Sequence, residues 1–335
     1  MDLLEELQTR LVCGDGAMGT LLMEGGFPLE GCFEELCVTE PARVRAVHEQ
    51  YLAAGARVIE TNTFGANAVR LERFGLEGRV REINRAAAEI ARTAAKVKDA
   101  VVAGSVGPLG ISAEEAKARG IDRGECFREQ VTGLLEGGAE LIFLETFMDD
   151  AEMALAFAAK QAVGAGLTIC SFACSAEGRL STGTPLVEAF VRLRSAGAQM
   201  VGVNCMNGPR GMVQLLERVP ADYLLAAYAN AGYPMYHEGR FIYQTAPEYF
   251  AQSAREMVAQ GARLIGGCCG TNPTHVRAIA EAIAELQPVT HKTVRVMTEP
   301  LPAAKKHESA AEVNLAERAA RGERVIICEL DPPKT

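Results

Sequence analysis

Short apolar runs alternate along the chain with longer amphipathic stretches. Four of these runs share a similar phrase, in which a helix-like stretch ends near a glycine and an apolar run follows, at residues 54–60, 138–145, 197–204 and 261–267. Glycine is typical of the position just after a helix. The apolar runs are too short for helices and too continuously apolar for a half-exposed sheet, so they predict buried parallel strands.

Extending this pattern to the whole chain gives eight strand–helix units. The predicted strands are 11–14, 58–61, 101–104, 141–145, 168–172, 200–204, 223–227 and 264–267. The predicted helices include 40–54, 82–97, 125–137, 150–163, 185–195, 247–260 and 273–286. Eight such units in about 290 residues indicate an α/β fold, a (β/α)8 TIM barrel. A doubly wound open sheet is the alternative.

Composition limits which binding partners and which cellular location are expected. The 335 residues carry a net charge of −9, which argues against a nucleic-acid partner. The sequence shows no apolar run of the roughly 20 residues needed to span a bilayer, so no membrane association is expected. The acidic N-terminus does not resemble a secretory signal, and several of the ten cysteines lie in apolar runs, as reduced thiols do. A cytoplasmic location is therefore expected.

Three cysteines follow predicted strands, where barrel enzymes place their chemistry. Cys205 follows the sixth strand, and Cys268 with Cys269 follows the eighth. Only one strand separates these two, a distance of about 10 Å, so their sulfurs can converge on one ion. Neighbouring glycines allow the irregular backbone that two adjacent ligands need. Three thiolates favour Zn²⁺ and leave a fourth position open, as in catalytic sites, although ordinary buried cysteines are the alternative.

The donor set also indicates a type of reaction. Three thiolates make zinc a weaker Lewis acid toward water than histidine ligands do, which makes a zinc hydrolase barrel the less natural alternative. A substrate thiol suits the site better, because coordination deprotonates the thiol while sulfur stays nucleophilic. The residues therefore predict alkyl transfer to a thiol. A non-catalytic zinc-binding or redox module remains a further alternative.

Several of these motifs resemble the homocysteine S-methyltransferase family. Residues 202–205 with 266–271 are similar to its zinc signature, and residues 14–20 and 60–64 are similar to its first two substrate loops. The resemblance spans roughly residues 5 to 290. It implies an enzyme of one-carbon metabolism that transfers a methyl group to the thiol of L-homocysteine and so forms methionine, with Zn²⁺ held by Cys205, Cys268 and Cys269.

The resemblance also implies roles for other residues. Asp15 and Glu145 are expected near the substrate ammonium group, and the backbone N–H groups of a glycine-rich turn near its carboxylate. Two asparagines are expected to orient the zinc ligands. The residues expected at the substrate are Asp15, Ala17, Met18, Gly19, Thr63, Phe64 and Glu145, and the orienting residues are Asn204 and Asn230. No catalytic residue beyond the zinc site is expected.

The sequence leaves the identity of the methyl donor open, and also the kind of parent chain to which the C-terminal tail belongs. S-methylmethionine, S-adenosylmethionine, methylcobalamin and methyltetrahydrofolate are all compatible donors. The predicted domains are a barrel at 1–290, a linker at 291–322, and the first strand of a truncated following domain at 323–335. That strand resembles the start of a methylenetetrahydrofolate reductase domain, which implies a bifunctional parent chain. The homocysteine domain of a cobalamin-dependent methionine synthase is the alternative.

Overall fold

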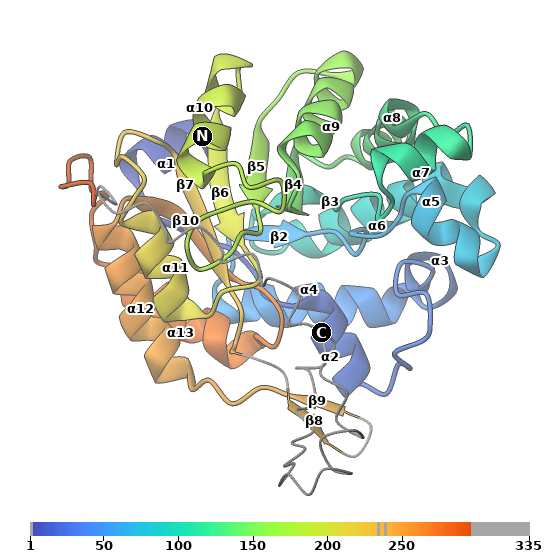
Figure 1. Ribbon diagram of the computed structural model, residues 1–335. Coiled ribbons are helices and arrows are strands. Elements are labelled where there is room, and N and C mark those ends of the chain that lie inside the picture. Colours follow the sequence, from blue (N-terminus) through green and yellow to red (C-terminus); the bar gives the residue numbers. More distant parts are fainter. Residues whose placement is uncertain (1–2, 233–234, 238–239, 296–335) are drawn as a thin grey trace, which may run out of the picture. The chain divides into compact units, whose positions relative to one another are not determined.

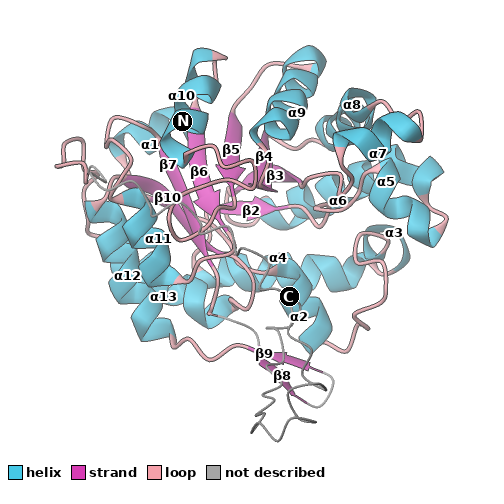
Figure 2. Ribbon diagram, viewed as in Figure 1, coloured by secondary structure: helices cyan, strands magenta, loops and turns pink. Residues whose placement is uncertain are grey.

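Parallel strands form the centre of the molecule and helices surround them, as the computed structural model shows (Figures 1 and 2). The structure describes residues 3–295 except 233–234 and 238–239. The strands of the main sheet are β1 (Val12–Cys13), β2 (Val58–Glu60), β3 (Val101–Val106), β4 (Leu141–Phe147), β5 (Thr168–Phe172), β6 (Met200–Asn204), β7 (Leu225–Ala229) and β10 (Ala262–Gly267). A separate antiparallel hairpin contains β8 (Met235–His237) and β9 (Arg240–Ile242).

The helices lie mostly between successive strands, as the sequence predicts. They are α1 (Leu3–Thr9), α2 (Met18–Glu24), α3 (Leu36–Thr39), α4 (Pro41–Ala54), α5 (Ala68–Leu71), α6 (Val80–Ala95), α7 (Ala113–Ala118), α8 (Arg123–Glu136), α9 (Asp150–Val163), α10 (Leu186–Ser195), α11 (Pro209–Leu216), α12 (Pro247–Ala259) and α13 (Pro273–Ile283), with 3₁₀ turns at Glu72–Phe74 and Glu77–Arg79. No helix in the described part of the chain has the length and apolar character needed to cross a membrane.

The sheet curves into a nearly closed barrel. Its strand order is β1-β10-β7-β6-β5-β4-β3-β2, with every neighbour parallel. The two edge strands also approach each other, because Gly14 forms a parallel bridge with Val58 and the Arg57 N–H donates to the Cys13 carbonyl at 2.8 Å. This closure confirms the predicted (β/α)8 class and excludes an open doubly wound sheet.

The glycines of the repeated phrase have the backbone conformation that the sequence predicts. Gly55, Gly138, Gly197 and Gly261 have φ values of 109°, 92°, 97° and 93°. Such left-handed positions favour glycine because a Cβ atom would be strained there. Each glycine therefore ends a helix and turns the chain toward the next strand.

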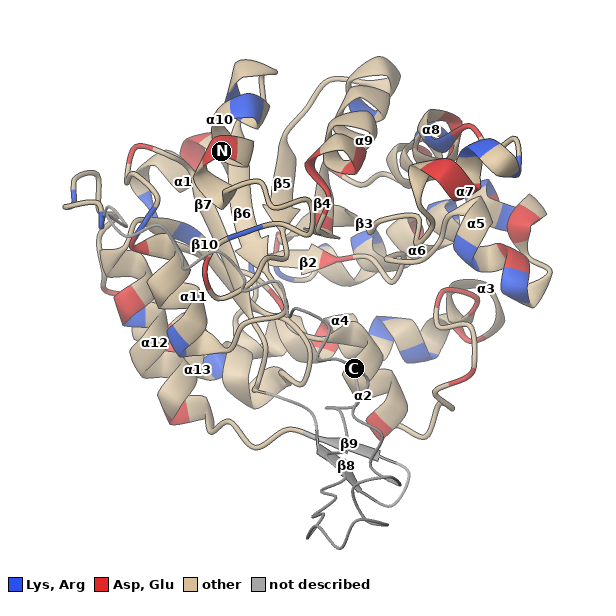
Figure 3. Cartoon of the chain, in the orientation of Figure 1, with Lys and Arg blue, Asp and Glu red and all other residues tan. Residues whose placement is uncertain are grey.

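The barrel interior changes character along its axis. Apolar side chains such as Val58, Leu141 and Ile169 fill it toward the amino ends of the strands, in one packed cluster. Toward the carboxyl ends the interior carries acidic and other polar side chains, among them Glu60 and Glu145. In Figure 3 the strands are mostly tan, and acidic residues are coloured on β2 and β4. One end of the barrel is thus built for packing and the other for chemistry.

Strand β7 is two residues further along the chain than predicted. The sequence places it at 223–227, whereas it runs from Leu225 to Ala229. Its register pairs Tyr228 with Asn204 of β6 and with Gly266 of β10. The Tyr228 ring packs inside the barrel against Gly266, so an aromatic residue that seemed to follow the strand belongs to it.

Candidate active site

Three sulfurs converge at the carboxyl ends of β6 and β10. The Sγ atoms of Cys205, Cys268 and Cys269 all lie within 4.8 Å of one another, and those of Cys205 and Cys269 are 3.9 Å apart. All three residues are partly accessible to solvent. Zn–S bonds of about 2.3 Å in a tetrahedral site put ligand sulfurs about 3.8 Å apart. The residues present therefore fit a zinc ion. We call these three cysteines the sulfur side.

Strand β7 holds both cysteine-bearing turns. The Cys205 N–H donates to the Tyr228 carbonyl at 3.0 Å, and the Cys268 N–H donates to the next carbonyl, that of Ala229, at 2.8 Å. Cys205 itself has φ of 58°, a left-handed conformation that is rare outside glycine. Gly270, just after the cysteine pair, has φ of 78°. The irregular backbone that the sequence predicts near Cys268 and Cys269 is thus present, and a second irregular turn at Cys205 accompanies it.

Hydrogen bonding among the thiols makes the three cysteines unequal. Hydrogen bonds from Cys268 and then from Cys269 lower the pKa of Cys205 to about 3. The hydrogen bond with Cys205 is the largest cause that raises the pKa of Cys268 well above its ordinary value and that of Cys269 to about 12. Burial raises the pKa of Cys37 to about 12, so an isolated buried thiol of this chain behaves in the opposite way to Cys205. The thiolate is thus favoured at Cys205, and a metal ion would displace the remaining thiol protons.

Three carboxyl groups face the same end of the barrel. The Glu60 N–H donates to Asp15 Oδ2 at 2.8 Å, and the Ser105 hydroxyl donates to Glu145 Oε1 at 2.5 Å. These residues come from the ends of β1, β2, β3 and β4, so neighbouring strands bring them together. We call Asp15, Glu60 and Glu145 the carboxyl side. Ser105 is a site residue that the sequence analysis did not single out, and the adjacent strand end with Glu145 is the signal that could have found it.

Burial and mutual repulsion disfavour full ionisation of the carboxyl side. Burial raises the pKa of Asp15, and the charge of Glu145 raises it further. Burial and then the charges of Glu145 and Asp15 raise the pKa of Glu60, while burial raises that of Glu145 against a hydrogen bond from Ser105. Among the residues that the structure describes, no Lys, Arg or His forms an ion pair with any of the three. The group therefore favours a cationic ligand.

The two asparagines that the sequence singles out occupy different surroundings. Asn230 lies beside Cys205 and helps to lower the pKa of that thiol. Asn204 instead bonds Thr146 twice, through its Nδ2 to the hydroxyl at 2.6 Å and through its Oδ1 to the N–H at 2.8 Å. Its Nδ2 also lies 3.4 Å from Glu145 Oε2. Asn230 thus contacts a proposed metal ligand, whereas Asn204 braces Glu145 and the left-handed Thr146, whose φ is 61°.

The glycine-rich turn after β1 leads directly into α2. The Ala17 N–H donates to Thr271 Oγ1 at 3.1 Å and so is already engaged. Met18 and Gly19 begin α2, and N–H groups of a first helical turn have no partner inside the helix. The predicted carboxylate contact therefore depends on Met18 and Gly19 rather than on all three residues.

Thr63 and Phe64 follow β2, and the structure gives them different exposure. Thr63 is fully buried, and its hydroxyl donates to the Ser105 carbonyl at 2.7 Å. Phe64 is half-buried and lies against Gly107, with the Arg70 guanidinium 5.2 Å from the centre of its ring. Thr63 thus holds the loop in place, and Phe64 is the member of this pair that keeps some exposure. Contact of either residue with a substrate stays a prediction.

Tyr243 is a residue near the sulfur side that the sequence did not single out. Its ring lies against Gly270, and the charges of Cys269, Cys205 and Cys268 contribute, after burial, to raising its pKa to about 12. The nearby Thr245 carbonyl is 2.7 Å from His275 Nε2, which anchors this segment to the start of α13. No sequence pattern marks Tyr243, because the chain between β9 and α12 has no periodicity that places it.

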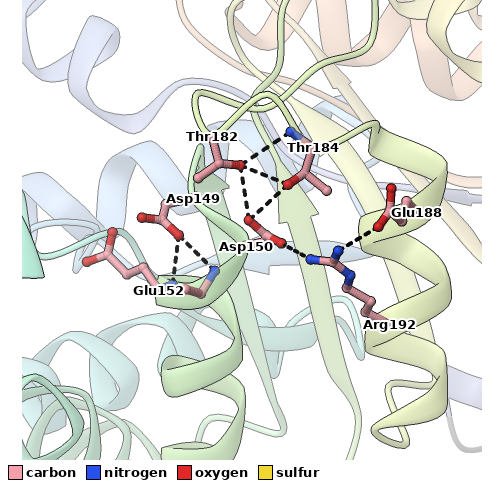
Figure 4. Close-up of polar contacts among 8 residues, drawn as sticks. Asp149, Asp150, Glu152, Thr182, Thr184, Glu188 and Arg192 are labelled. Carbon is pink, nitrogen blue, oxygen red and sulfur yellow. Dashed lines mark hydrogen bonds and ion pairs between the residues drawn. The ribbon is translucent and has the colours of Figure 1, made fainter.

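A polar network fixes the loop beside the end of β4 (Figure 4). Asp149 caps α9 by accepting from the N–H groups of Ala151 and Glu152 at 2.7 and 3.2 Å. Asp150 accepts from the Thr182 hydroxyl at 3.0 Å and pairs with Arg192 of α10. The loop between β5 and α10 is thereby tied to the start of α9, which follows the strand that carries Glu145.

The fold and the site together define a class. A parallel α/β barrel with a three-cysteine metal group at the carboxyl ends of its strands belongs among the metal-dependent barrel enzymes. The family model for homocysteine S-methyltransferase matches residues 12–283. The chain therefore belongs to the homocysteine S-methyltransferase family.

Known proteins agree with this assignment. The chain is 33% identical over 311 residues to the methionine synthase of Mycobacterium tuberculosis and 32% identical to that of Mycobacterium leprae. It spans about a quarter of the length of these curated relatives. Among solved structures, it resembles the metallated form of the homocysteine methyltransferase MmuM from Escherichia coli, with a TM-score of 0.67 and 26% identity over 81% of this chain and 96% of that one.

Proposed function

We propose that this chain transfers a methyl group to the thiol of L-homocysteine and forms methionine, with Zn²⁺ bound by Cys205, Cys268 and Cys269. The observation that carries the proposal is the convergence of three sulfurs within 4.8 Å at the barrel end that also holds three carboxyl groups. A sulfur ligand and an amino acid head group would thus be recognised on opposite sides of one site. The family assignment supports the same reaction.

Each part of the substrate has matching residues. Zinc, when bound, would take the substrate sulfur at its open position and keep it deprotonated at neutral pH. Asp15 and Glu145 would accept hydrogen bonds from the substrate ammonium group. The N–H groups of Met18 and Gly19, at the start of α2, would receive the carboxylate. No protein side chain is needed as a general base.

Asn204 and Asn230 would keep the two sides in place. Asn230 lies beside Cys205 and would favour its thiolate, and Asn204 holds the turn at Thr146 next to Glu145. The partial exposure of the three cysteines leaves room for a methyl donor to approach the substrate sulfur in line. S-methylmethionine, S-adenosylmethionine, methylcobalamin and methyltetrahydrofolate stay compatible donors.

The domain division and the location stay predictions. We infer a barrel domain at about 1–290, of which the structure describes the greater part. The predicted linker at 291–322 is described only as far as Arg295, whose N–H donates to the Glu217 carbonyl at 2.9 Å. The predicted strand at 323–335, with its resemblance to a methylenetetrahydrofolate reductase, lies outside the described residues. A cytoplasmic location is likewise inferred from the sequence.

The test is methionine formation by zinc-loaded protein from homocysteine with each of the four donors in turn. We expect one donor to support turnover, a chelator to abolish it, and added Zn²⁺ to restore it. Homocysteine binding is measured separately by calorimetry. A zinc-loaded protein that binds no homocysteine would contradict the proposal and would favour a zinc-binding module or a hydrolase.

A further inference from the structure

Tyr228 lies inside the barrel beneath the site, and its ring is held in place by packing. Tyr228 is 3% exposed, and its ring lies edge-on to Phe143 with centroids 5.2 Å apart. Glycines make room for it, because a Cβ atom at Gly14 would lie 2.1 Å from the hydroxyl oxygen, and one at Gly266 would lie 2.4 Å from Cε1. The sequence therefore reserves space for this ring and directs its hydroxyl toward β1 and β2.

The Tyr228 hydroxyl and Glu60 Oε1 are enclosed polar atoms without a hydrogen-bond partner. Such atoms are uncommon because each costs about 1–3 kcal/mol. The charges of Glu60 and Asp15 act on Tyr228, which places the hydroxyl beside the carboxyl side, although its contact with Glu60 does not meet hydrogen-bond geometry. Asp15 and Glu145, in contrast, already accept hydrogen bonds from the protein. The Glu60 carboxyl contacts that of Glu145, but its enclosed Oε1 has no partner and can accept a further hydrogen bond.

The chemistry of this group selects the type of ligand. Three carboxyl groups meet with no ion-pair partner among the described residues, so a bound cation would relieve their repulsion. An ammonium group carries three N–H donors, which matches three carboxyl groups. The proposed substrate brings such a group together with the thiol that the sulfur side requires. This step rests on the proposed function.

We propose that Glu60, supported by the Tyr228 hydroxyl, is a specificity-determining residue that makes thiol binding depend on an amino group in the substrate. Glu60 remains partly accessible at the barrel interior, and a bound ammonium group would favour its ionised form beside Asp15 and Glu145. Tyr228 offers an O–H donor on the enclosed side of that carboxylate. Thiols without the amino group gain nothing from either residue.

The test compares two thiols that differ only in the amino group. Dissociation constants for homocysteine and 4-mercaptobutanoate are measured on zinc-loaded wild type, E60Q and Y228F by calorimetry, with zinc content determined for each. We expect E60Q to weaken homocysteine binding about tenfold and 4-mercaptobutanoate binding less than twofold. Y228F should reduce the preference for homocysteine, measured as the ratio of the two dissociation constants, by about threefold. The control is E140Q, which removes an exposed carboxyl just before β4 at the opposite end of the barrel and should leave both constants unchanged.

The outcomes separate this inference from the proposed function. An equal loss for both thiols in E60Q, or unchanged homocysteine binding, would overturn the role of Glu60 while leaving the methyltransferase proposal intact. Failure of wild type to bind either thiol would overturn the proposed function and this inference with it. If E60Q does not fold, Y228F decides, because an unchanged ratio in that variant contradicts the proposal.

Discussion

The two sides of the site are built by different means. The sulfur side depends on irregular backbone, with Cys205 in a left-handed conformation and Gly270 just beyond the cysteine pair. The carboxyl side depends on strand register, because Glu60 and Glu145 belong to β2 and β4 and Asp15 lies two residues after β1. Turns bring adjacent ligands to one point, whereas strands place side chains at a fixed spacing around the barrel wall.

This difference matches what each side would hold. A metal ion demands ligand atoms at defined distances. The two cysteine-bearing turns suit this demand, because each donates a backbone hydrogen bond to one of two consecutive β7 carbonyls. An ammonium group needs negative charge and acceptors from several directions, which neighbouring strand ends supply. The sulfur side should therefore respond sharply to the loss of one atom, and the carboxyl side more gradually.

The largest expected effect is the loss of a sulfur ligand. Cys269→Ser should abolish stoichiometric zinc binding and reduce methionine formation by about 1,000-fold or more, because a hydroxyl is a far poorer zinc ligand than a thiolate. Zinc content and turnover are measured together. Cys126→Ser is the matched control, since Cys126 is half-buried on α8 and contacts no part of the site. Retained zinc and activity in Cys269→Ser would refute the metal assignment.

A smaller effect is expected on the carboxyl side. Glu145→Gln should keep full zinc content but weaken homocysteine binding about 100-fold, because it removes a charge that faces the substrate ammonium in a buried setting. Calorimetry with homocysteine measures the loss, and metal analysis checks the sulfur side. Loss of zinc together with homocysteine binding would show that the two sides are not separable.

The sequence was sufficient for the barrel and the sulfur side. Repeated helix–glycine–strand phrases predicted the eight parallel strands, and glycine at positions such as Gly55 marked the turns. Cys205, Cys268 and Cys269 could be grouped because barrel topology brings alternate strand ends together. These inferences needed only local pattern and a fold with fixed geometry.

The carboxyl side was only partly predictable, for a physical reason. Tyr228 seemed to lie beyond its strand, because a run of small apolar residues sets no register, and the partner strands decide it. Glu60 stood in a motif but had no visible partner, since its environment depends on Asp15 and Glu145 from other strands. Contacts between side chains of separate strands are not encoded in any local spacing.

A third prediction tests the support of the sulfur side. Asn230→Ala should weaken zinc affinity by about 10- to 100-fold, because Cys205 loses a neighbouring polar side chain that lowers the pKa of its thiol and favours the thiolate that binds zinc. Zinc affinity is measured by competition with a chromogenic chelator. At saturating zinc, homocysteine affinity should change far less than in Glu145→Gln. An unchanged zinc affinity would mean that the turn at Cys205 holds its sulfur without help from Asn230.

The smallest expected effect is that of Glu60→Gln on stability. This substitution should weaken homocysteine binding but stabilise the ligand-free fold. The pKa of Glu60 is raised in the folded protein, so its stabilising contribution is present below its unfolded value near 4.5 and is lost as the pH rises through the folded value. Glu60→Gln should therefore stabilise the ligand-free protein by on the order of 1 kcal/mol at pH 8 and by much less at pH 4.5. Urea unfolding at both pH values measures this, with Glu140→Gln as the control.

With saturating homocysteine at pH 8 the gain in stability should shrink or reverse, since wild type then has the bound ammonium group to compensate its carboxylates. A gain that is independent of both pH and homocysteine would mean that Glu60 is neutral in the folded protein and takes no part in the carboxyl side.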